Sequence, residues 1–343
     1  MKAFTSYIEK LGSNFLVSAM VPSFAFVIAS ALIYDPILHI AAFKNNEATP
    51  QLFSLELIVF ILTVIIGFTL TALNTYILKI FEGYIIFPPM RFLYNKGLQI
   101  HRRRARNLMA QRESLEKEYQ HLKKLTRNDP ALEERRGKIL DEHHRVASEY
   151  DENYPANLDD VLPTQFGNVL RAAEDHAIQR YGFDGVTFWP RLIHIIPDSY
   201  KAVIDSTRNE LSFLVNMSIL SLIFTFLCIV AIFTMLGTSI AVSGNATVFG
   251  ALVGSTLKYL FAAALGMIGC GFFYNASIIS LGSFALTIRA SFDLFRRDLL
   301  QKLEVVRPNN FDEEFDTWEN LNELIVLGNQ SLTFEKFDFR AEK

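Results

Sequence analysis

Four long apolar stretches constrain the fold of this chain more than any other feature of its sequence. An α-helix needs about 20 mostly apolar residues to cross roughly 30 Å of hydrocarbon. Four stretches meet that requirement: residues 14–34, 57–78, 211–236 and 259–288. The sequence therefore predicts an all-α, polytopic membrane protein with four transmembrane helices. The first two of these spans follow an N-terminal tail within residues 1–82.

The segments between the spans are strongly polar. Hydrophobic residues make up 50% of the chain and charged residues 20%, so the apolar residues must be concentrated in blocks. The polar segments predict a helical cytoplasmic domain over residues 83–210 and further cytoplasmic helices over 289–343 that pack on it. The formal net charge of −3 gives no reason to expect nucleic acid as a partner.

Basic residues beside the spans predict the orientation in the membrane. Between Glu82 and Glu113 the chain has no acidic residue, and its basic residues there include Arg91, Lys96, Arg102, Arg103, Arg104 and Arg106. An excess of Lys and Arg next to a span marks its cytoplasmic side. With four spans, both termini are then expected in the cytoplasm and the protein in the cell membrane, with residues 35–56 and 237–258 outside.

A helical hairpin is predicted over residues 95–150. In its first arm, leucines recur at seven-residue spacing amid dense mixed charge, and a tyrosine lies beside them: Leu108, Leu115, Leu122 and Tyr119. Asn128-Asp129-Pro130 supplies a turn, an N-cap and a proline at the first helical position of the second arm. The arms are expected to pack on each other, and a coiled coil between chains is the alternative.

The stretch LPTQFGNVLRAAEDHAIQRYG, residues 162–182, is followed by Trp189-Pro190-Arg191-Leu192. It resembles a segment of uncharacterised bacterial integral membrane proteins with four spans. The resemblance covers about a tenth of the chain. It implies a bacterial membrane protein with four spans, and it carries over no activity and no functional residues.

Polar and small residues in the last two spans are the candidate membrane sites. Lys258 and Asn275 could lie at the outer mouth or the wall of a pore, although Lys258 at the interface would only extend its charge into water. Small residues allow close helix packing in this region: Gly250, Gly254, Ala262, Gly266, Gly269, Gly271 and Ser277. The uncharged outer segment 237–258 is expected to be an interfacial loop, with a re-entrant segment as the alternative.

Motifs that carry familiar chemistry are missing from the sequence, including a Gly-rich phosphate loop, a Cys-x-x-Cys pair and a Gly-x-Ser-x-Gly elbow. The nearest candidates are Asp141-Glu142-His143-His144 and Glu174-Asp175-His176. Adjacent helical residues point about 100° apart, so these side chains do not converge on a metal. They are expected to be solvated helix faces, with metal binding or acid–base work as the alternative. We expect no cofactor and no enzymatic activity.

Three classes of function remain. The first is an oligomeric channel or membrane-perturbing effector that the cytoplasmic helical domain controls. The second is a non-conducting scaffold or anchor that recruits a cytoplasmic protein through the hairpin. A membrane enzyme or transporter is the third, and the absence of a polar constellation and of internal repeats disfavours it. Membrane lipid and further copies of the chain are the expected partners.

Overall fold

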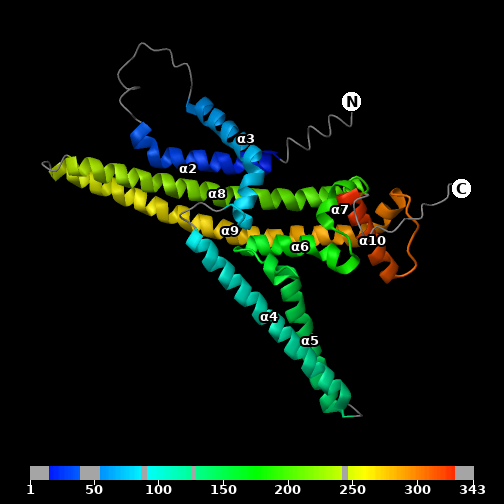
Figure 1. The fold of residues 1–343 in the computed structure, drawn as a ribbon. Coiled ribbons are helices and arrows are strands. Elements are labelled where there is room, and N and C mark those ends of the chain that lie inside the picture. The colour runs from blue at the N-terminus through cyan, green and yellow to red at the C-terminus, as the bar shows by residue number, and fades with distance from the viewer. Residues whose placement is uncertain (1–14, 39–54, 86–90, 126–128, 242–245, 329–343) are drawn as a thin grey trace. The chain divides into compact units, whose positions relative to one another are not determined.

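The computed structural model describes residues 15–38, 55–85, 91–125, 129–241 and 246–328. Within these ranges the chain is helical, with no strand. Figure 1 shows the helices, which are η1 Leu16–Met20, α2 Val21–Leu38, α3 Leu55–Glu82, α4 Arg91–Leu125, α5 Pro130–Asn153, η3 Leu158–Asp160, α6 Gln165–Tyr181, α7 Gly185–Leu192, α8 Asp198–Ala241, α9 Ala246–Lys302 and α10 Phe311–Leu327.

Four segments are helices long and apolar enough to cross a membrane, as the sequence predicts. They are Leu16–Ile33, Glu56–Glu82, Asp198–Gly237 and Gly254–Lys302. Large apolar side chains on these helices face outward, such as Phe60, Phe226 and Phe261, which are 60%, 63% and 67% exposed. An apolar outer surface of this kind suits lipid rather than water. The chain is therefore a multi-pass helical membrane protein by the length and composition of its helices.

The chain divides into two compact units. The first contains residues 1–78 and 208–280, and the second contains residues 79–207 and 281–343. Helices α8 and α9 each contribute to both units without interruption.

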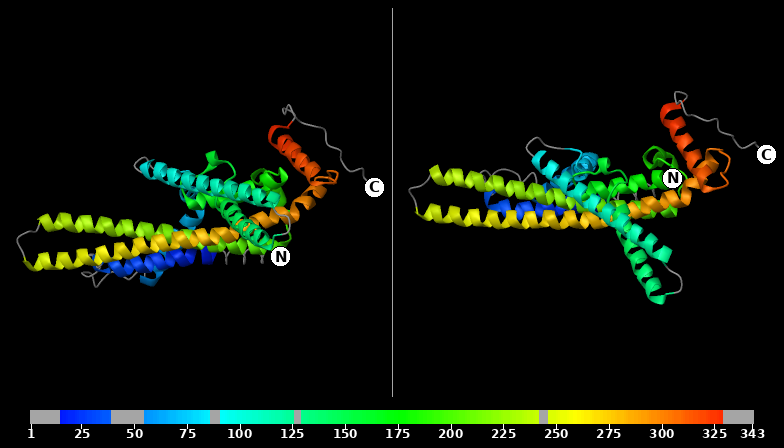
Figure 2. Two further views of the ribbon diagram at one scale, coloured as in Figure 1. Left: turned by 90° about the horizontal axis from the view of Figure 1, so that it is seen from below. Right: turned by 60° about the horizontal axis from the view of Figure 1, so that its bottom comes forward.

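In the first unit, α8 and α9 run side by side (Figure 2). Their contact is built from small and medium side chains, with Cys228 and Ala231 of α8 packed against Tyr259, Ala262 and Ala263 of α9. Small residues let two helix backbones approach closely, which is the usual basis of helix packing in lipid.

The prediction of an interfacial loop over residues 237–258 is wrong for most of that segment. The structure continues α8 to Ala241 and begins α9 at Ala246, so most of this segment is helical. Gly and Ser have weak helix propensity, but an apolar environment favours a backbone that satisfies its own hydrogen bonds. Neighbouring Ala, Val and Leu residues allow the two helices to extend into this segment. The pattern of apolar residues in the sequence does not reveal this extension.

The second unit has an aromatic core that joins α6, α7, α9 and α10. Phe183, Phe188, Phe292 and Trp318 are each at most 2% exposed. Phe183 stacks on Phe188 with ring centroids 4.7 Å apart and meets Trp318 edge to face at 4.4 Å. Edge-to-face and offset pairs of this kind stabilise a core beyond the area that they bury.

A buried carboxylate attaches α10 to α9. Glu314, whose side chain is 2% exposed, accepts from Arg296 Nε at 2.9 Å and from Arg297 Nη2 at 3.1 Å. Asn310 caps the start of α10 by accepting from the backbone N–H of Glu313. The C-terminal helix is thus held by both apolar and charged contacts within the second unit.

Candidate functional site

Lys258 lies where the sequence predicts a possible pore mouth, and its ammonium group bonds to helix α2. Its Nζ donates to the carbonyl oxygens of Ile33 at 3.2 Å and Leu32 at 3.4 Å. In an α-helix the carbonyl of residue 32 would accept from the N–H of residue 36, which here is Pro36 and has no N–H. Lys258 therefore supplies the donor that Pro36 cannot.

Asn216 has the same relationship to the other proline of α2. Its Nδ2 donates to the carbonyl oxygen of Ser18 at 2.7 Å, and the residue is 3% exposed. Ser18 lies four residues before Pro22, so this carbonyl also lacks its α-helical donor. The chain is locally π-helical over Leu16–Met20, directly before this proline. Both prolines of α2 thus have a polar side chain from α8 or α9 at the carbonyl four residues before them.

Asn275 does not bond across helices. Its side chain is exposed, and its Nδ2 donates at 2.9 Å to the carbonyl oxygen of Gly271 on the same helix. Gly266 faces α8, and Asn275 is nine residues further on, so at about 100° per residue it points to the opposite side of α9. Lys258 and Asn275 are therefore not brought together as one site.

The predicted small residues of α9 divide between two faces. Ala262 is buried against α8, and a side chain at Gly266 would collide with Thr225 Oγ1 and Phe224. Gly269 faces Ser221, and Ser277 is fully buried with its hydroxyl donating to Tyr274 O. Gly254 and Gly271 have open space around them, and the surroundings of Gly250 lie outside the described residues.

The hairpin of α4 and α5 has a regular antiparallel register. Three side-chain pairs link the helices: Arg104 with Glu149 at 3.3 Å, Gln111 with Glu142 at 3.5 Å, and Glu118 with Arg135 at 2.8 Å. Each step is seven residues forward on α4 and seven back on α5. Seven-residue steps on both helices are the mark of an antiparallel coiled coil.

Apolar residues fill the seam of the hairpin within the chain itself. Leu108 and Leu122 are 9% and 5% exposed, and Leu115 and Tyr119 are half-buried. On α5, Ile139 and Val146 are 8% and 1% exposed. Because the two arms cover each other's seam, the hairpin needs no second chain to bury it.

Close contacts fix the stem of the hairpin, by which we mean the start of α4 and the end of α5. Gly97 faces the carbonyl oxygen of Pro163 so closely that a Cβ would collide with it. His101 lies 3.3 Å from the hydroxyl of Tyr154, and burial together with the charge of Arg104 lowers the pKa of His101. The Tyr150 hydroxyl donates to the carbonyl of Pro155 at 2.9 Å.

The predicted basic cluster separates into engaged and exposed residues. Arg104 pairs with Glu149, and Arg102 is half-buried with Nη2 at 3.4 Å from the carbonyl of Asp159. The others are exposed and form no ion pair with a described residue: Arg91, Lys96, Arg103 and Arg106.

A cluster around Asp293 is the site that sequence reasoning missed. Its Oδ1 accepts from the Tyr181 hydroxyl at 2.8 Å and lies 3.1 Å from His176 Nε2. His176 and Asp293 border a cavity of about 450 Å³, which Arg180 and Arg289 also line. Burial lowers the pKa of His176, and the hydrogen bond and charge of Asp293 oppose that shift. The sequence places His176 and Asp293 117 residues apart, so no local pattern could pair them.

The structure does not use Glu174-Asp175-His176 as one cluster. Arg171 pairs with Glu174 and Asp175, each at 3.4 Å, while His176 faces Asp293. Burial raises the pKa of both carboxyls, and Arg171 opposes the rise. Among the described residues, no group of three or more His, Cys, Asp and Glu could hold a metal ion.

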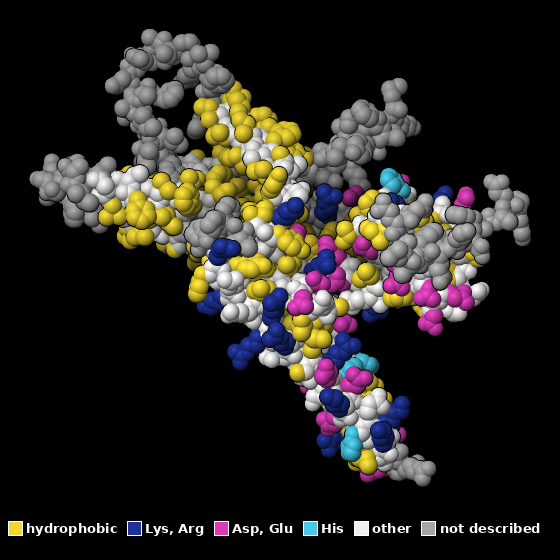
Figure 3. All heavy atoms as spheres, viewed as in Figure 1, with side chains coloured by type: hydrophobic (Ala, Val, Ile, Leu, Met, Phe, Trp, Pro, Cys, Tyr) yellow, Lys and Arg dark blue, Asp and Glu magenta, His cyan; other side chains and the backbone are white. Residues whose placement is uncertain are grey.

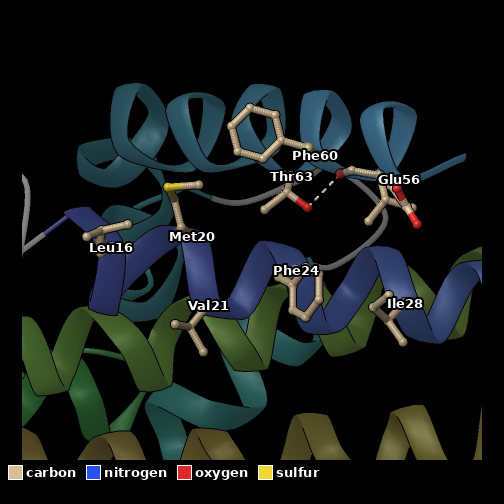
Figure 4. Close-up of a pocket in the computed structure, with 9 residues that line it drawn as sticks. Leu16, Met20, Val21, Phe24, Ile28, Glu56, Phe60 and Thr63 are labelled. Carbon is tan, nitrogen blue, oxygen red and sulfur yellow. Dashed lines mark hydrogen bonds between the residues drawn. The ribbon is translucent and has the colours of Figure 1, made fainter. Parts of the chain in front are cut away.

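An apolar cavity of about 580 Å³ lies between α2 and α3 (Figure 4). Its lining includes Leu16, Met20, Phe24, Ile28 and Phe60. The hydroxyl of Thr63 donates to the carbonyl of Val59 at 2.8 Å, so it offers little to a ligand. Such a surface suits hydrocarbon, and Glu56 is the charged group in its lining.

Comparisons with protein-family models, with curated proteins and with solved structures give no match to this chain.

Proposed function

We propose that the protein is a homo-oligomeric, non-conducting membrane scaffold. Its four apolar helices anchor it, both termini and the second unit lie in the cytoplasm, and the α4–α5 hairpin is the arm that binds a cytoplasmic protein. The orientation rests on the basic, acid-free stretch between Glu82 and Glu113.

The bonding of Lys258 and Asn216 carries this proposal. A conducting path needs polar groups that are free to face an ion. Lys258 donates to two carbonyls of α2, and the Nδ2 of Asn216 donates to the carbonyl of Ser18 in η1. Side chains of α8 also fill the space beside Gly266 and Gly269. These groups stabilise packing within one chain, which is the role that an anchor requires.

The hairpin supports the scaffold role because its apolar seam is internal and its surface is charged. Glu134 and Lys138 on α5 have side chains 70% and 74% exposed. A hairpin whose apolar seam is already buried can present such groups to a partner without unfolding. This arrangement favours recognition by polar contacts over a coiled coil between chains.

The outward face of α9 supports self-association. Ala264, Gly271, Asn275 and Gly282 are all exposed, and their spacing of seven, four and seven residues places them in one stripe. Small residues with an Asn among them suit contact between transmembrane helices, where an amide finds partners that lipid cannot give. A passage between copies, lined by Asn275, is the second candidate function, and this stripe is the observation that favours it.

Current across a planar bilayer containing the purified protein distinguishes the two functions. A scaffold gives no current for the parent protein and none for Asn275→Asp. Current whose cation preference increases in Asn275→Asp would establish the passage between copies and contradict the scaffold. Mass measurement in detergent tests the stripe separately, because Asn275→Leu with Gly271→Leu should reduce the oligomer while Phe226→Leu, on the exposed surface of α8, should not.

Photo-crosslinking from the hairpin tests the partner. A photoreactive residue at Glu134 should give a discrete cross-linked protein in intact cells. The same residue at Val146, which is 1% exposed, should give none because the site is covered. If Glu134 and neighbouring exposed positions cross-link to no protein, the hairpin is not a recruiting arm.

A further inference from the structure

The first turns of α4 carry exposed apolar side chains next to exposed basic ones. Phe92, Leu93 and Ile100 are 72%, 62% and 54% exposed. Lys96 and Arg103 are exposed between them. We call these five residues the basic apolar face.

This face is distinct from the side of α4 that packs against the end of α5. Leu98, Ala105 and Leu108 belong to the core with α5, and Ala105 is fully buried. At about 100° per residue, Phe92, Lys96 and Arg103 point to the opposite side of the helix, with Leu93 and Ile100 along one edge. The helix therefore has two faces here, and within the part of the chain that the structure describes only the inner one is covered.

The charge of α4 changes along its length. The part from Arg91 to Arg112 has no acidic residue, whereas the remainder contains Glu113, Glu116 and Glu118. In Figure 3, dark blue Lys and Arg side chains and yellow apolar ones adjoin along the part of the molecule that α4 occupies. Positive charge beside exposed apolar groups is complementary to an anionic membrane surface, where phosphates meet acyl chains.

Chain connectivity keeps this face near the membrane. Helix α3, which is long and apolar enough to cross, ends at Glu82, and α4 begins at Arg91. Residues 83–90 can span at most roughly 30 Å when fully extended. The start of α4 thus remains within reach of the lipid headgroups, whereas Leu125 at its other end is about 50 Å further along the helix.

We propose that the basic apolar face of α4 binds anionic lipid. Phe92, Leu93 and Ile100 insert at the boundary between headgroups and acyl chains, and Lys96 and Arg103 bind lipid phosphates. This contact fixes the base of the hairpin on the membrane surface. It is independent of whether the hairpin recruits a partner.

Tryptophan quenching in nanodiscs tests the binding. Phe92→Trp is compared with Leu125→Trp, an exposed apolar position (55% exposed) at the other end of the same helix. In discs with phosphatidylglycerol, brominated lipid should quench the tryptophan at 92 and leave that at 125 unchanged. Native Trp189 and Trp318 give the same background in both variants.

Charge dependence identifies the lipid class. Lys96→Gln with Arg103→Gln should weaken surface binding about 30-fold and remove most of the quenching at position 92. Lys123→Gln with Lys124→Gln, at the far end of α4, should not. Quenching should also decrease in discs of phosphatidylcholine alone.

Three results would overturn the proposal. The tryptophan at 92 could be unquenched in both kinds of disc, which would place the face in water. Equal quenching in neutral discs and in the Lys96→Gln, Arg103→Gln protein would show apolar insertion without anionic lipid. Protection of position 92 from both brominated lipid and aqueous acrylamide, with cross-links between copies, would show that a second chain covers the face.

Discussion

Asn216 donates from Nδ2 to the carbonyl oxygen of Ser18 at 2.7 Å, four residues before Pro22. Lys258 does the same for the carbonyl of Leu32, four residues before Pro36. A proline in a transmembrane helix leaves a carbonyl without its donor, and lipid cannot replace the donor. Side chains of α8 and α9 thus bond to η1 and α2 at the carbonyls four residues before their two prolines.

Replacing Asn216 with Leu should destabilise the first unit by about 1–2 kcal/mol, because a buried carbonyl loses its donor. Pro22→Ala supplies the missing N–H, so the loss in the double variant Pro22→Ala, Asn216→Leu should be smaller than the sum of the two single losses. Unfolding in increasing denaturing detergent measures each value. Strict additivity of the two substitutions would show that Asn216 does not compensate for Pro22.

Replacing Lys258 with Met should loosen α2 from α9 by about 1 kcal/mol, and Lys258→Arg should retain most of the stability because it keeps a donor. Pro36→Ala should again rescue Lys258→Met. Cross-linking between cysteines introduced at Ile33 and Leu257 reports this contact without reference to global unfolding. Equal cross-linking in the parent and Lys258→Met proteins would mean that the ammonium group does not hold α2.

Length and composition were sufficient to predict the four apolar helices, because crossing a bilayer requires a long uncharged run wherever it occurs. The leucines at seven-residue spacing and the turn at Asp129-Pro130 likewise indicate α4 and α5, since both signals are local. The partners of Asn216 and Lys258 could not be predicted, because they depend on how three helices pack. Pro22 and Pro36 were a usable signal that some side chain supplies a donor.

Two features of the second unit lay outside any local pattern. Asp293 accepts a hydrogen bond from the Tyr181 hydroxyl and lies beside His176. Both partners are more than 100 residues away in the sequence. Glu314 is one of several acidic residues at the start of α10, and its burial against Arg296 distinguishes it from exposed Glu313. Sequence patterns describe the face of a helix, whereas these pairs depend on which helix covers that face.

Substitution of Leu122 should destabilise the hairpin, whereas substitution of nearby Leu125 should have little effect on its stability. Leu122→Ala removes a side chain that is 5% exposed and should cost about 2–3 kcal/mol of hairpin stability. Leu125→Ala, three residues on and 55% exposed, should change stability by less than about 0.5 kcal/mol. Hydrogen exchange of α4 and α5 amides measures both. Similar protection in the two variants would contradict a covered seam at this end.

His176 should make the second unit less stable at mildly acidic pH. Burial lowers the pKa of His176 below its ordinary value of about 6.5 in the folded state, although Asp293 opposes the shift. The folded protein therefore binds this proton less readily than the unfolded chain, so the unfolding free energy falls as pH decreases from about 6.5 toward the folded pKa. Half-buried His101 has its pKa lowered in the same direction and contributes a parallel loss. His176→Gln should flatten the stability profile between about pH 7 and 5, whereas His121→Gln, at an exposed position of α4, should leave the profile as in the parent.

Thermal melting between about pH 7 and 5 measures how steeply stability changes with pH in each variant. A steeper decline with acid in His176→Gln would mean that Asp293 stabilises a protonated imidazole and that the sign assigned to His176 is wrong.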